Sequence, residues 1–292
     1  MAFDVQAHRG GLGLVVENTM AAFRNAVQFP ITTLECDVHI SADGTAMVTH
    51  DRVISAKKIK DTAPATSGDS EFPYVGKLIS RLSREQLATL DCGSLTLPDH
   101  PHQRAVPGEP MPTFDQVLSL AKEHNLLVNV ETKFEATSPD ETAPRDRFIN
   151  VVLAEIERFD MSGSVMVQSF DWLLLRQLGW ADRRIRRAAL ISARTAAIGL
   201  PGISPWLDGI DLDDHDGDPL GVVSNFGFDV ISPDKSMVTD EFVRRAHDLN
   251  VQVIPYTVDD PADIAHIIET GADGMITNYP DRALAVLTGR LG

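Results

Sequence analysis

The chain has 292 residues, 43% of them hydrophobic, and a formal net charge of −16. A chain of this length can bury a substantial core, and we expect a single domain over residues 1–292. The negative charge argues against nucleic acid or an anionic membrane as a partner, because both bind clustered lysine and arginine. No apolar run reaches membrane-spanning length, so no stable membrane insertion is expected, and the two distant cysteines predict neither a zinc site nor a disulfide framework.

The first predicted elements are a strand, a turn and a helix. Residues 5–10 form a short apolar run that ends in His8, Arg9 and a glycine, which is typical of a buried strand that opens into a turn. Asn18 is predicted to cap the helix that follows, and Pro30 cannot continue that helix.

The next predicted strand, 34–40, carries acidic side chains. Side chains alternate along a strand, so Glu35 and Asp37 share one face. Two adjacent carboxylates repel each other, and a divalent cation with oxygen ligands, such as Mg²⁺ or Ca²⁺, would relieve that repulsion. The Asp-Gly pair at 43–44 predicts a two-residue hairpin turn, which would return His50 towards the carboxylates.

Five motifs between residues 5 and 51 carry a resemblance to a known family. In chain order they are His-Arg-Gly, Glu-Asn-Thr, Glu-x-Asp, Asp-Gly and His-Asp. Their order and spacing closely resemble the glycerophosphodiester phosphodiesterase family. Val16 stands where this family usually has proline, a difference that concerns the loop and not the chemistry.

Residues 52–111 differ in composition from the segments around them. They are rich in Pro, Ser, Thr and Gly, and their one convincing helix signal is a capping box at Ser83 and Gln86. Long irregular insertions on compact scaffolds are usually functional loops, and the family resemblance implies a substrate-facing insertion here. His100 and His102 lie within it and are expected to be solvent-exposed loop residues and not ligands.

A later strand brings further charged groups. In the run LLVNVETK at 126–133, Glu131 and Lys133 share a face near the carboxyl end of the strand. By resemblance, Glu131 completes a metal triad with the two carboxylates of the second strand, while Lys133 and Arg9 bind the phosphate. The alternative is a surface ion pair between Glu131 and Lys133.

Helix and strand patterns alternate through the rest of the chain. Strands expected to be parallel begin near residues 5, 34, 126, 165, 187, 228, 251 and 274. Eight such units predict a TIM (β/α)₈ barrel with a small insertion after the second strand, and a doubly wound open sheet is the alternative fold. In a TIM barrel, active sites lie at the carboxyl ends of the strands, where the candidate residues fall.

Three further features bear on the site. By resemblance, Tyr256 stands at a position where the family usually has tryptophan. Its aromatic ring could pack against the glycerol backbone of a substrate. His39 lies two residues after Asp37, so its side chain is on the same face of the predicted strand and could support the metal ligands. The acidic run at 208–218 does not fit a calcium loop, because Leu212 occupies the first ligand position, so a solvated loop is expected.

The predicted activity is metal-dependent hydrolysis of glycerophosphodiesters to glycerol 3-phosphate and an alcohol, with the substrate class supplied by the resemblance. Imidazoles can serve as acid and base near neutral pH, and His8 and His50 are assigned these roles without deciding which is which. The predicted cofactor is one divalent ion, Ca²⁺ or Mg²⁺, with Mn²⁺ as a further option. The other assigned residues are the metal ligands Glu35, Asp37 and Glu131 and the substrate- or phosphate-binding residues Arg9, Lys133, Asn18 and Tyr256.

Two alternative functions stay open. One is activity on lysophospholipids or sphingomyelin-like lipids, which an apolar channel lined by the insertion would favour. The other is a non-catalytic metal-binding barrel that senses phosphodiesters, against which the two histidines argue. The first strand begins almost at Met1, so the cytoplasm is the expected location, with secretion the alternative if Met1 is not the natural start. The sequence predicts neither headgroup preference nor oligomeric state.

Overall fold

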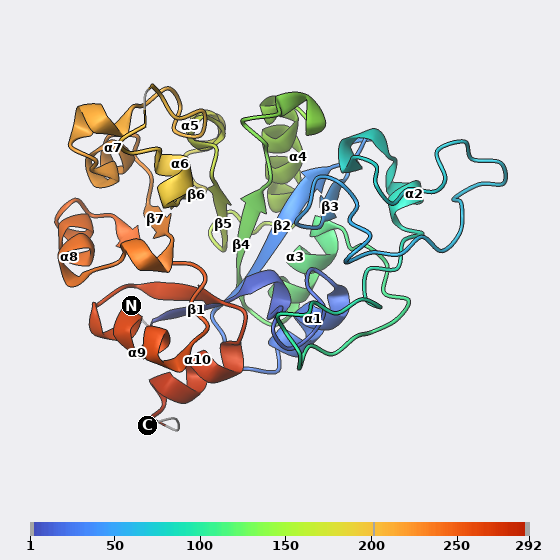
Figure 1. Cartoon of the computed structure of the whole chain (residues 1–292), viewed down its shortest axis with the longest axis horizontal. Coiled ribbons are helices and arrows are strands. Elements are labelled where there is room, and N and C mark those ends of the chain that lie inside the picture. Colours follow the sequence, from blue (N-terminus) through green and yellow to red (C-terminus); the bar gives the residue numbers. More distant parts are fainter. Residues whose placement is uncertain (1–2, 201, 290–292) are drawn as a thin grey trace.

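The fold is a parallel β-barrel surrounded by helices (Figure 1). The computed structural model describes residues 3–200 and 202–289. The parallel strands are β1 (Asp4–Ala7), β2 (Thr33–Ile40), β4 (Leu127–Thr132), β5 (Val165–Ser169), β6 (Arg186–Ile191), β7 (Val230–Pro233), β8 (Gln252–Val253) and β9 (Gly274–Thr277). They pair in the order β8-β7-β6-β5-β4-β2-β1-β9.

Backbone hydrogen bonds also join the two ends of this order. The N–H of Asp273 donates to the carbonyl of Val253 at 2.9 Å, and the N–H of Ile276 donates to that of Pro255 at 2.9 Å. The predicted TIM barrel is therefore confirmed, and the open doubly wound sheet is excluded.

Helices connect successive strands. They are α1 (Met20–Ala26), α2 (Arg84–Leu87), α3 (Phe114–Glu123), α4 (Arg145–Arg158), α5 (Trp172–Ala181), α6 (Ala193–Ala196), α7 (Pro219–Asn225), α8 (Asp240–Asp248), α9 (Pro261–Glu269) and α10 (Pro280–Leu287), with short 3₁₀ turns η1 (His8–Gly10), η2 (Ile79–Arg81), η3 (Pro139–Glu141), η4 (Leu212–His215) and η5 (Lys235–Met237). Within the described residues, no helix has the length and apolar character needed to cross a membrane.

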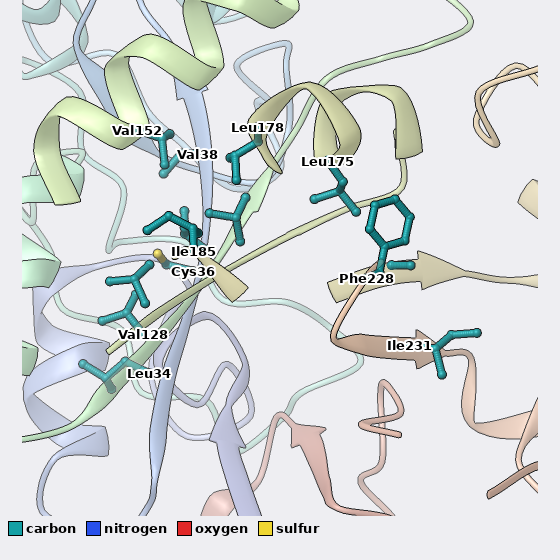
Figure 2. Packing of buried hydrophobic residues seen from close by; sticks show 14 of the residues in the cluster. Leu34, Cys36, Val38, Val128, Val152, Leu175, Leu178, Ile185, Phe228 and Ile231 are labelled. Carbon is teal, nitrogen blue, oxygen red and sulfur yellow. The ribbon is translucent and has the colours of Figure 1, made fainter. Parts of the chain in front are cut away.

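The main core lies between the outer face of the barrel and the helices (Figure 2). Cys36 and Val38 of β2 point into this layer, where Val152 of α4 and Leu178 of α5 also lie. The alternation of β2 thus sends apolar side chains outwards and leaves Glu35 and Asp37 facing inwards. Both cysteines are free, and Cys36 is fully buried in this layer.

The predicted cap of α1 is wrong by one residue. Thr19 is the N-cap, and its hydroxyl accepts a hydrogen bond from the N–H of Ala22 at 3.1 Å. Asn18 has a left-handed backbone, with φ of 52°, and its side-chain amide donates to Asp37 instead. Both residue types are good caps, so the tertiary contact with Asp37 decides between them.

The hairpin after β2 has a wider turn than predicted. Strand β3 (Ala46–Val48) pairs antiparallel with β2, with Ile40 opposite Ala46. The N–H of Ser41 donates to the carbonyl of Thr45 at 2.9 Å, and that of Gly44 donates to Ser41 at 3.1 Å. The Ser41 hydroxyl also accepts a hydrogen bond from the N–H of Thr45 at 2.9 Å. This bond satisfies a backbone donor within a turn that is longer than two residues.

The segment 52–111 contains η2 and α2, and it extends to one side of the barrel (Figure 1). The predicted capping box of Ser83 and Gln86 is present. A second buried apolar cluster holds the segment together, formed by Met47, Ile54, Ile59, Tyr74, Ile79, Leu82, Leu87, Leu90, Cys92 and Met111. This core gives the segment a fixed shape despite its few regular elements.

The segment is also bonded to the loop after β1. The N–H of Val16 donates to the carbonyl of Arg104 at 3.2 Å, a bond that a proline at this position could not make. His100 differs from the expectation of solvent exposure, because it is partly buried and its Nδ1 lies 2.9 Å from the hydroxyl of Tyr279. His102 is exposed, as expected.

Candidate active site

Three carboxylates meet at the carboxyl ends of β2 and β4. Glu35, Asp37 and Glu131 each offer an oxygen, and these oxygens lie within 4.8 Å of one another. All three side chains are buried. Asp37 lies directly opposite Glu131 in the β2–β4 pairing, so parallel register on neighbouring strands produces the cluster.

The charges of this cluster are unevenly balanced. Burial, and then the charge of Asp37, raises the pKa of Glu35 well above its usual value. Burial raises the pKa of Glu131 to about 7, which Lys133 opposes and Asp37 reinforces. Burial also acts against ionisation of Asp37, but Arg9 and Lys133 hold its pKa well below the usual range. One buried oxygen of Asp37, Oδ1, has no hydrogen-bond partner.

An oxygen-only ligand set with such repulsion fits a divalent metal ion. Hard cations prefer carboxylate oxygens, and a bound cation would favour the ionised form of every carboxylate in the cluster. The unpaired Oδ1 of Asp37 provides a free ligand atom. Glu35, Asp37 and Glu131 can therefore hold a metal ion together.

Arg9 reaches the cluster from the turn after β1. Its backbone N–H donates to Oε2 of Glu35 at 2.8 Å, and its Nε lies 3.1 Å from Oδ2 of Asp37. Its backbone is left-handed, with φ of 52°, which is unfavourable for a residue with a Cβ. The next residue must be Gly10, because a Cβ there would lie 2.9 Å from the backbone of Ala22. The turn is therefore shaped so that Arg9 faces the carboxylates.

Lys133 lies just beyond the carboxyl end of β4. Its Nζ is 2.7 Å from Oε1 of Glu131 and 3.7 Å from Oδ1 of Asp37. The Lys133 side chain is largely buried, so this contact is not the surface ion pair considered as an alternative. Burial acts against its charge, but Glu131 and Asp37 raise its pKa above the usual value.

His8 is held by a neutral amide from the opposite end of the chain. Its Nδ1 lies 2.6 Å from Oδ1 of Asn278, and the Nδ2 of Asn278 donates to Asp259 at 2.7 Å. This second bond makes Oδ1 the atom that faces His8, so His8 must donate from Nδ1. Burial, followed by the charge of Arg9, lowers the pKa of His8 to about 3. Its Nε2, 4.0 Å from Glu35, is then free of a proton.

His50 is held by a carboxylate. Its Nδ1 lies 2.6 Å from Oδ1 of Asp51, and a carboxylate can only accept, so His50 also donates from Nδ1. Burial, followed by the charge of Lys133, lowers its pKa to about 4. His39 is buried, and its Nε2 lies 3.2 Å from the carbonyl oxygen of His50. His39 thus contacts the backbone of His50 and not a carboxylate of the cluster.

A polar column runs through the barrel below the carboxylates. Gln168 donates from Nε2 to Oε1 of Glu35 at 2.8 Å and accepts from Asn129 at 2.9 Å. Asn129 also donates to Gln6 at 2.7 Å, and Gln6 donates to Asp4 at 2.8 Å. These side chains line the inner face of the barrel, so Glu35 is oriented by a buried network that crosses its interior.

Most of the candidate residues line one or both of two adjoining cavities, here called the inner and the outer lobe. The inner lobe, of about 220 Å³, is lined by His8, Arg9 and Tyr256 among others. The outer lobe, of about 530 Å³, is lined by Asp51, Arg52 and Trp206 among others. Both are bounded by a shared set, His50, Glu131, Lys133 and Phe170.

Two candidate substrate-binding residues occupy different places. The Tyr256 ring meets that of Phe170 edge-on at 5.8 Å, and its hydroxyl donates to the carbonyl of Ile191 at 3.1 Å. Asn18 instead donates to Oδ2 of Asp37 at 2.9 Å and lines a small separate cavity beneath the segment 52–111. Tyr256 therefore lines the inner lobe, whereas the side chain of Asn18 contacts the carboxylate of Asp37.

The acidic run near η4 serves local structure. Asp211 caps η4 and Asp218 caps α7, each through a side-chain oxygen. Asp208 pairs with Arg176, and Asp213 accepts from the N–H of Gly199 at 2.9 Å. These contacts give four aspartates of the run a local structural role.

Several residues contact the candidate site residues, directly or through one another, and were not predicted from the sequence to do so. They are Glu17, Lys58, Gln168, Asp259 and Asn278. Asn278 follows β9 directly, and Gln168 lies near the end of β5. The rule that barrel sites form at the carboxyl ends of strands could have singled them out. No comparable signal exists for Lys58, which lies in an irregular segment.

Known proteins resemble this chain in sequence and in fold. A model of the glycerophosphoryl diester phosphodiesterase family matches residues 8–282. The chain belongs to this family. Membership places the protein among hydrolases of phosphoric diesters. The family resemblance of the sequence motifs is thereby confirmed.

Relatives match over nearly the whole chain. The glycerophosphodiester phosphodiesterase of Caldanaerobacter subterraneus subsp. tengcongensis is 24% identical, over 95% of this chain and 94% of its own. A solved structure of a Silicibacter pomeroyi DSS-3 protein named for the same family gives a TM-score of 0.83 at 26% identity, covering 99% of this chain and 94% of that one. A phosphodiesterase of Oleispira antarctica, solved with its product sn-glycerol-3-phosphate, has the same fold, with a TM-score of 0.71 at 19% identity and coverage of 98% and 96%.

Proposed function

We propose that this protein hydrolyses glycerophosphodiesters to glycerol 3-phosphate and an alcohol, with a divalent metal ion held by Glu35, Asp37 and Glu131. The observation that carries the proposal is the meeting of these three carboxylates with two cations and two hydrogen-bonded histidines around one cavity. Family membership supports the reaction, and the product bound by the Oleispira antarctica protein supports the substrate class.

The charges of the site suit a phosphodiester. Arg9 and Lys133 line the inner lobe, and we assign them to the phosphoryl oxygens, whose negative charge otherwise repels a nucleophile. Their contacts with Asp37 fix both cations before substrate arrives. A bound metal ion would act as a Lewis acid on the phosphoryl group. The oxygen-only ligand set favours Ca²⁺ or Mg²⁺, with Mn²⁺ as a further option.

The two histidines are suited to proton transfer. Each donates from Nδ1 to a fixed acceptor, Asn278 for His8 and Asp51 for His50, so each presents Nε2 to the reaction. One imidazole, in its neutral form, would accept the proton of the attacking hydroxyl or water at Nε2. The other must carry a second proton, on Nε2, to protonate the leaving alkoxide, and the negative charge of a bound phosphodiester favours that cationic form. A protein that only senses phosphodiesters would need neither group.

The outer lobe is suited to the leaving alcohol. We propose that residues 1–292 form one barrel domain whose segment 52–111 faces the substrate, because Arg52, Val53 and Ser55 of that segment line the outer lobe. Among these three, only Val53 is apolar, so the segment itself contributes little to an apolar channel, and the apolar lining of the lobe comes mainly from Phe134, Phe170 and Trp206. Tyr256 and Phe170 would pack against the glycerol moiety from the other side.

The proposal is tested by measuring glycerol 3-phosphate release from glycerophosphocholine. The protein is stripped with EDTA, and Ca²⁺, Mg²⁺ or Mn²⁺ is added back in turn. We expect release to stop on stripping and to return with at least one ion. No release with any ion from folded protein, on glycerophosphocholine and on a panel of other diesters, would contradict the proposal.

A further inference from the structure

One lysine of the segment 52–111 contacts two carboxylates that lie beside the candidate active site. The Nζ of Lys58 is 3.0 Å from Oε1 of Glu17 and 3.1 Å from Oδ2 of Asp51. Glu17 belongs to the loop after β1, and Asp51 follows His50. A single ammonium group therefore joins three separate stretches of the chain.

Each carboxylate also contacts a residue of the proposed machinery. Glu17 accepts from Nη1 of Arg9, at 3.2 Å to Oε1 and 3.3 Å to Oε2. Asp51 accepts from Nδ1 of His50 at 2.6 Å. The contacts thus form a continuous chain that runs Arg9, Glu17, Lys58, Asp51, His50.

We propose that Lys58 is a positioning residue that holds Glu17 against Arg9 and Asp51 against His50. The inference rests on the proposed function, in which Arg9 binds phosphate and His50 transfers a proton. Lys58 lines neither lobe of the cavity and lies beside the small cavity beneath the segment 52–111. It acts through its partners and does not touch the substrate.

The environment of Lys58 makes this contact more than a surface ion pair. The side chain of Glu17 is 8% exposed and that of Lys58 is 24% exposed, so solvent screens the pair weakly. Without the ammonium, Glu17 and Asp51 would face each other as like charges at short range, because both contact the same nitrogen. Burial opposes ionisation of Glu17, but Arg9 and then Lys58 lower its pKa.

The backbone that carries Lys58 is fixed on both sides. Ile54 and Ile59 are buried in the apolar cluster of the segment, and Lys60 exchanges two backbone hydrogen bonds with Asp91, each of 3.0 Å. The segment thus presents Lys58 to the site from a packed scaffold. Its neighbour Lys57 is exposed and makes no ion pair among the described residues.

This contrast supplies a matched control. Lys58→Met and Lys57→Met each remove one lysine charge from the same segment and keep a flexible apolar side chain. Turnover of glycerophosphocholine is measured with the metal-loaded protein. We expect Lys58→Met to lower kcat about tenfold, with less effect on KM, in keeping with the loss of a residue that orients a catalytic group. Lys57→Met should stay within about twofold of wild type, and Lys58→Arg should recover much of the loss.

A second readout does not depend on turnover. A proton held between Nδ1 of His50 and Asp51 gives a downfield imidazole signal by NMR, assigned through its disappearance in His50→Gln. We expect this signal to persist in Lys57→Met and to weaken or vanish in Lys58→Met. Lys58→Gln, which can still donate to one carboxylate, replaces Lys58→Met if the latter does not fold.

The outcomes distinguish a failure of the proposed function from a failure of the positioning role of Lys58. If wild-type protein turns over no diester, the proposed function fails, while the NMR comparison still tests the role of Lys58. If folded Lys58→Met matches Lys57→Met in both kcat and the His50 signal, the positioning role is wrong.

Discussion

In the inner lobe of the cavity, the charged side chains and both histidines come from one half of the barrel, and the other side chains come from the other half. His8, Arg9, His50, Glu131 and Lys133 belong to the first half of the chain, whereas Gln168, Phe170, Leu190, Tyr256, Thr257 and Ile276 belong to the second. Strands β1, β2 and β4 are neighbours in the sheet, so groups that start far apart in sequence converge there. The second half contributes shape and hydrogen-bond support.

This division predicts that substitutions in the two halves will have different effects. Changes to the site residues of the first half should remove chemistry or metal, while changes in the second half should weaken the orientation of those groups or only the stability of the fold. Substitutions test this division, from the largest expected effect on turnover or metal binding to the smallest.

The largest effect is expected from the histidines. His8→Ala and His50→Ala each remove a group that presents Nε2 to the cavity, so kcat should fall by about 10²-fold or more while the fold is kept. Turnover of glycerophosphocholine, together with circular dichroism, measures both properties. A folded variant with near-normal kcat would remove that histidine from the proposed mechanism.

The next effect concerns metal affinity. Glu35→Gln keeps the size of a buried side chain and removes a ligand charge, so affinity for the divalent ion should fall by more than the roughly 10- to 100-fold that a supporting residue costs. Isothermal titration calorimetry of the stripped protein measures this directly. Glu123→Gln, on the exposed face of α3, is the control. Unchanged affinity in Glu35→Gln would show that the triad assignment is wrong.

A smaller effect on metal affinity is expected from Gln168, a residue of the second half that orients Glu35. Gln168→Leu cannot donate to Glu35, so metal affinity should fall by about tenfold. Gln6→Leu disturbs the same polar column at a greater distance from Glu35, and it should lower stability but not metal affinity. Equal losses of affinity in both variants would mean that Gln168 acts through general stability and does not orient Glu35.

The sequence predicted the parts of this molecule that depend on periodicity. The eight strand positions follow from apolar runs, and the parity of β2 put Glu35 and Asp37 on one face, while the family resemblance added Glu131 to them. The barrel then followed from counting parallel strands. The catalytic and binding roles of the individual residues stay predictions.

The sequence could not predict contacts made between loops. His8 and Asn278 are 270 positions apart, and Lys58 lies 41 positions from Glu17. No periodicity links such residues, because their meeting depends on how β9 returns beside β1 and how the segment 52–111 packs. The misplaced cap of α1 has the same origin, since Asn18 was a sound cap by residue type and was recruited by Asp37.

The smallest effect on turnover is expected where the second half carries stability alone. Asp171 caps α5 through the N–H of Leu174 at 2.7 Å and pairs with Arg145 at 2.9 and 2.7 Å. Its side chain is only 1% exposed, so Asp171→Ala should lower the free energy of unfolding by about 3 kcal/mol, from the lost cap and the unpaired arginine.

Asp171→Asn keeps a capping oxygen and loses the charge, so denaturant unfolding should place it between Asp171→Ala and wild type. Below the unfolding temperature, kcat of both variants should stay within about threefold of wild type, although Phe170 of the cavity is the adjacent residue. A loss of kcat as large as that of the histidine variants would show that the second half positions the chemistry through its backbone. The division between charged and supporting halves would then not hold.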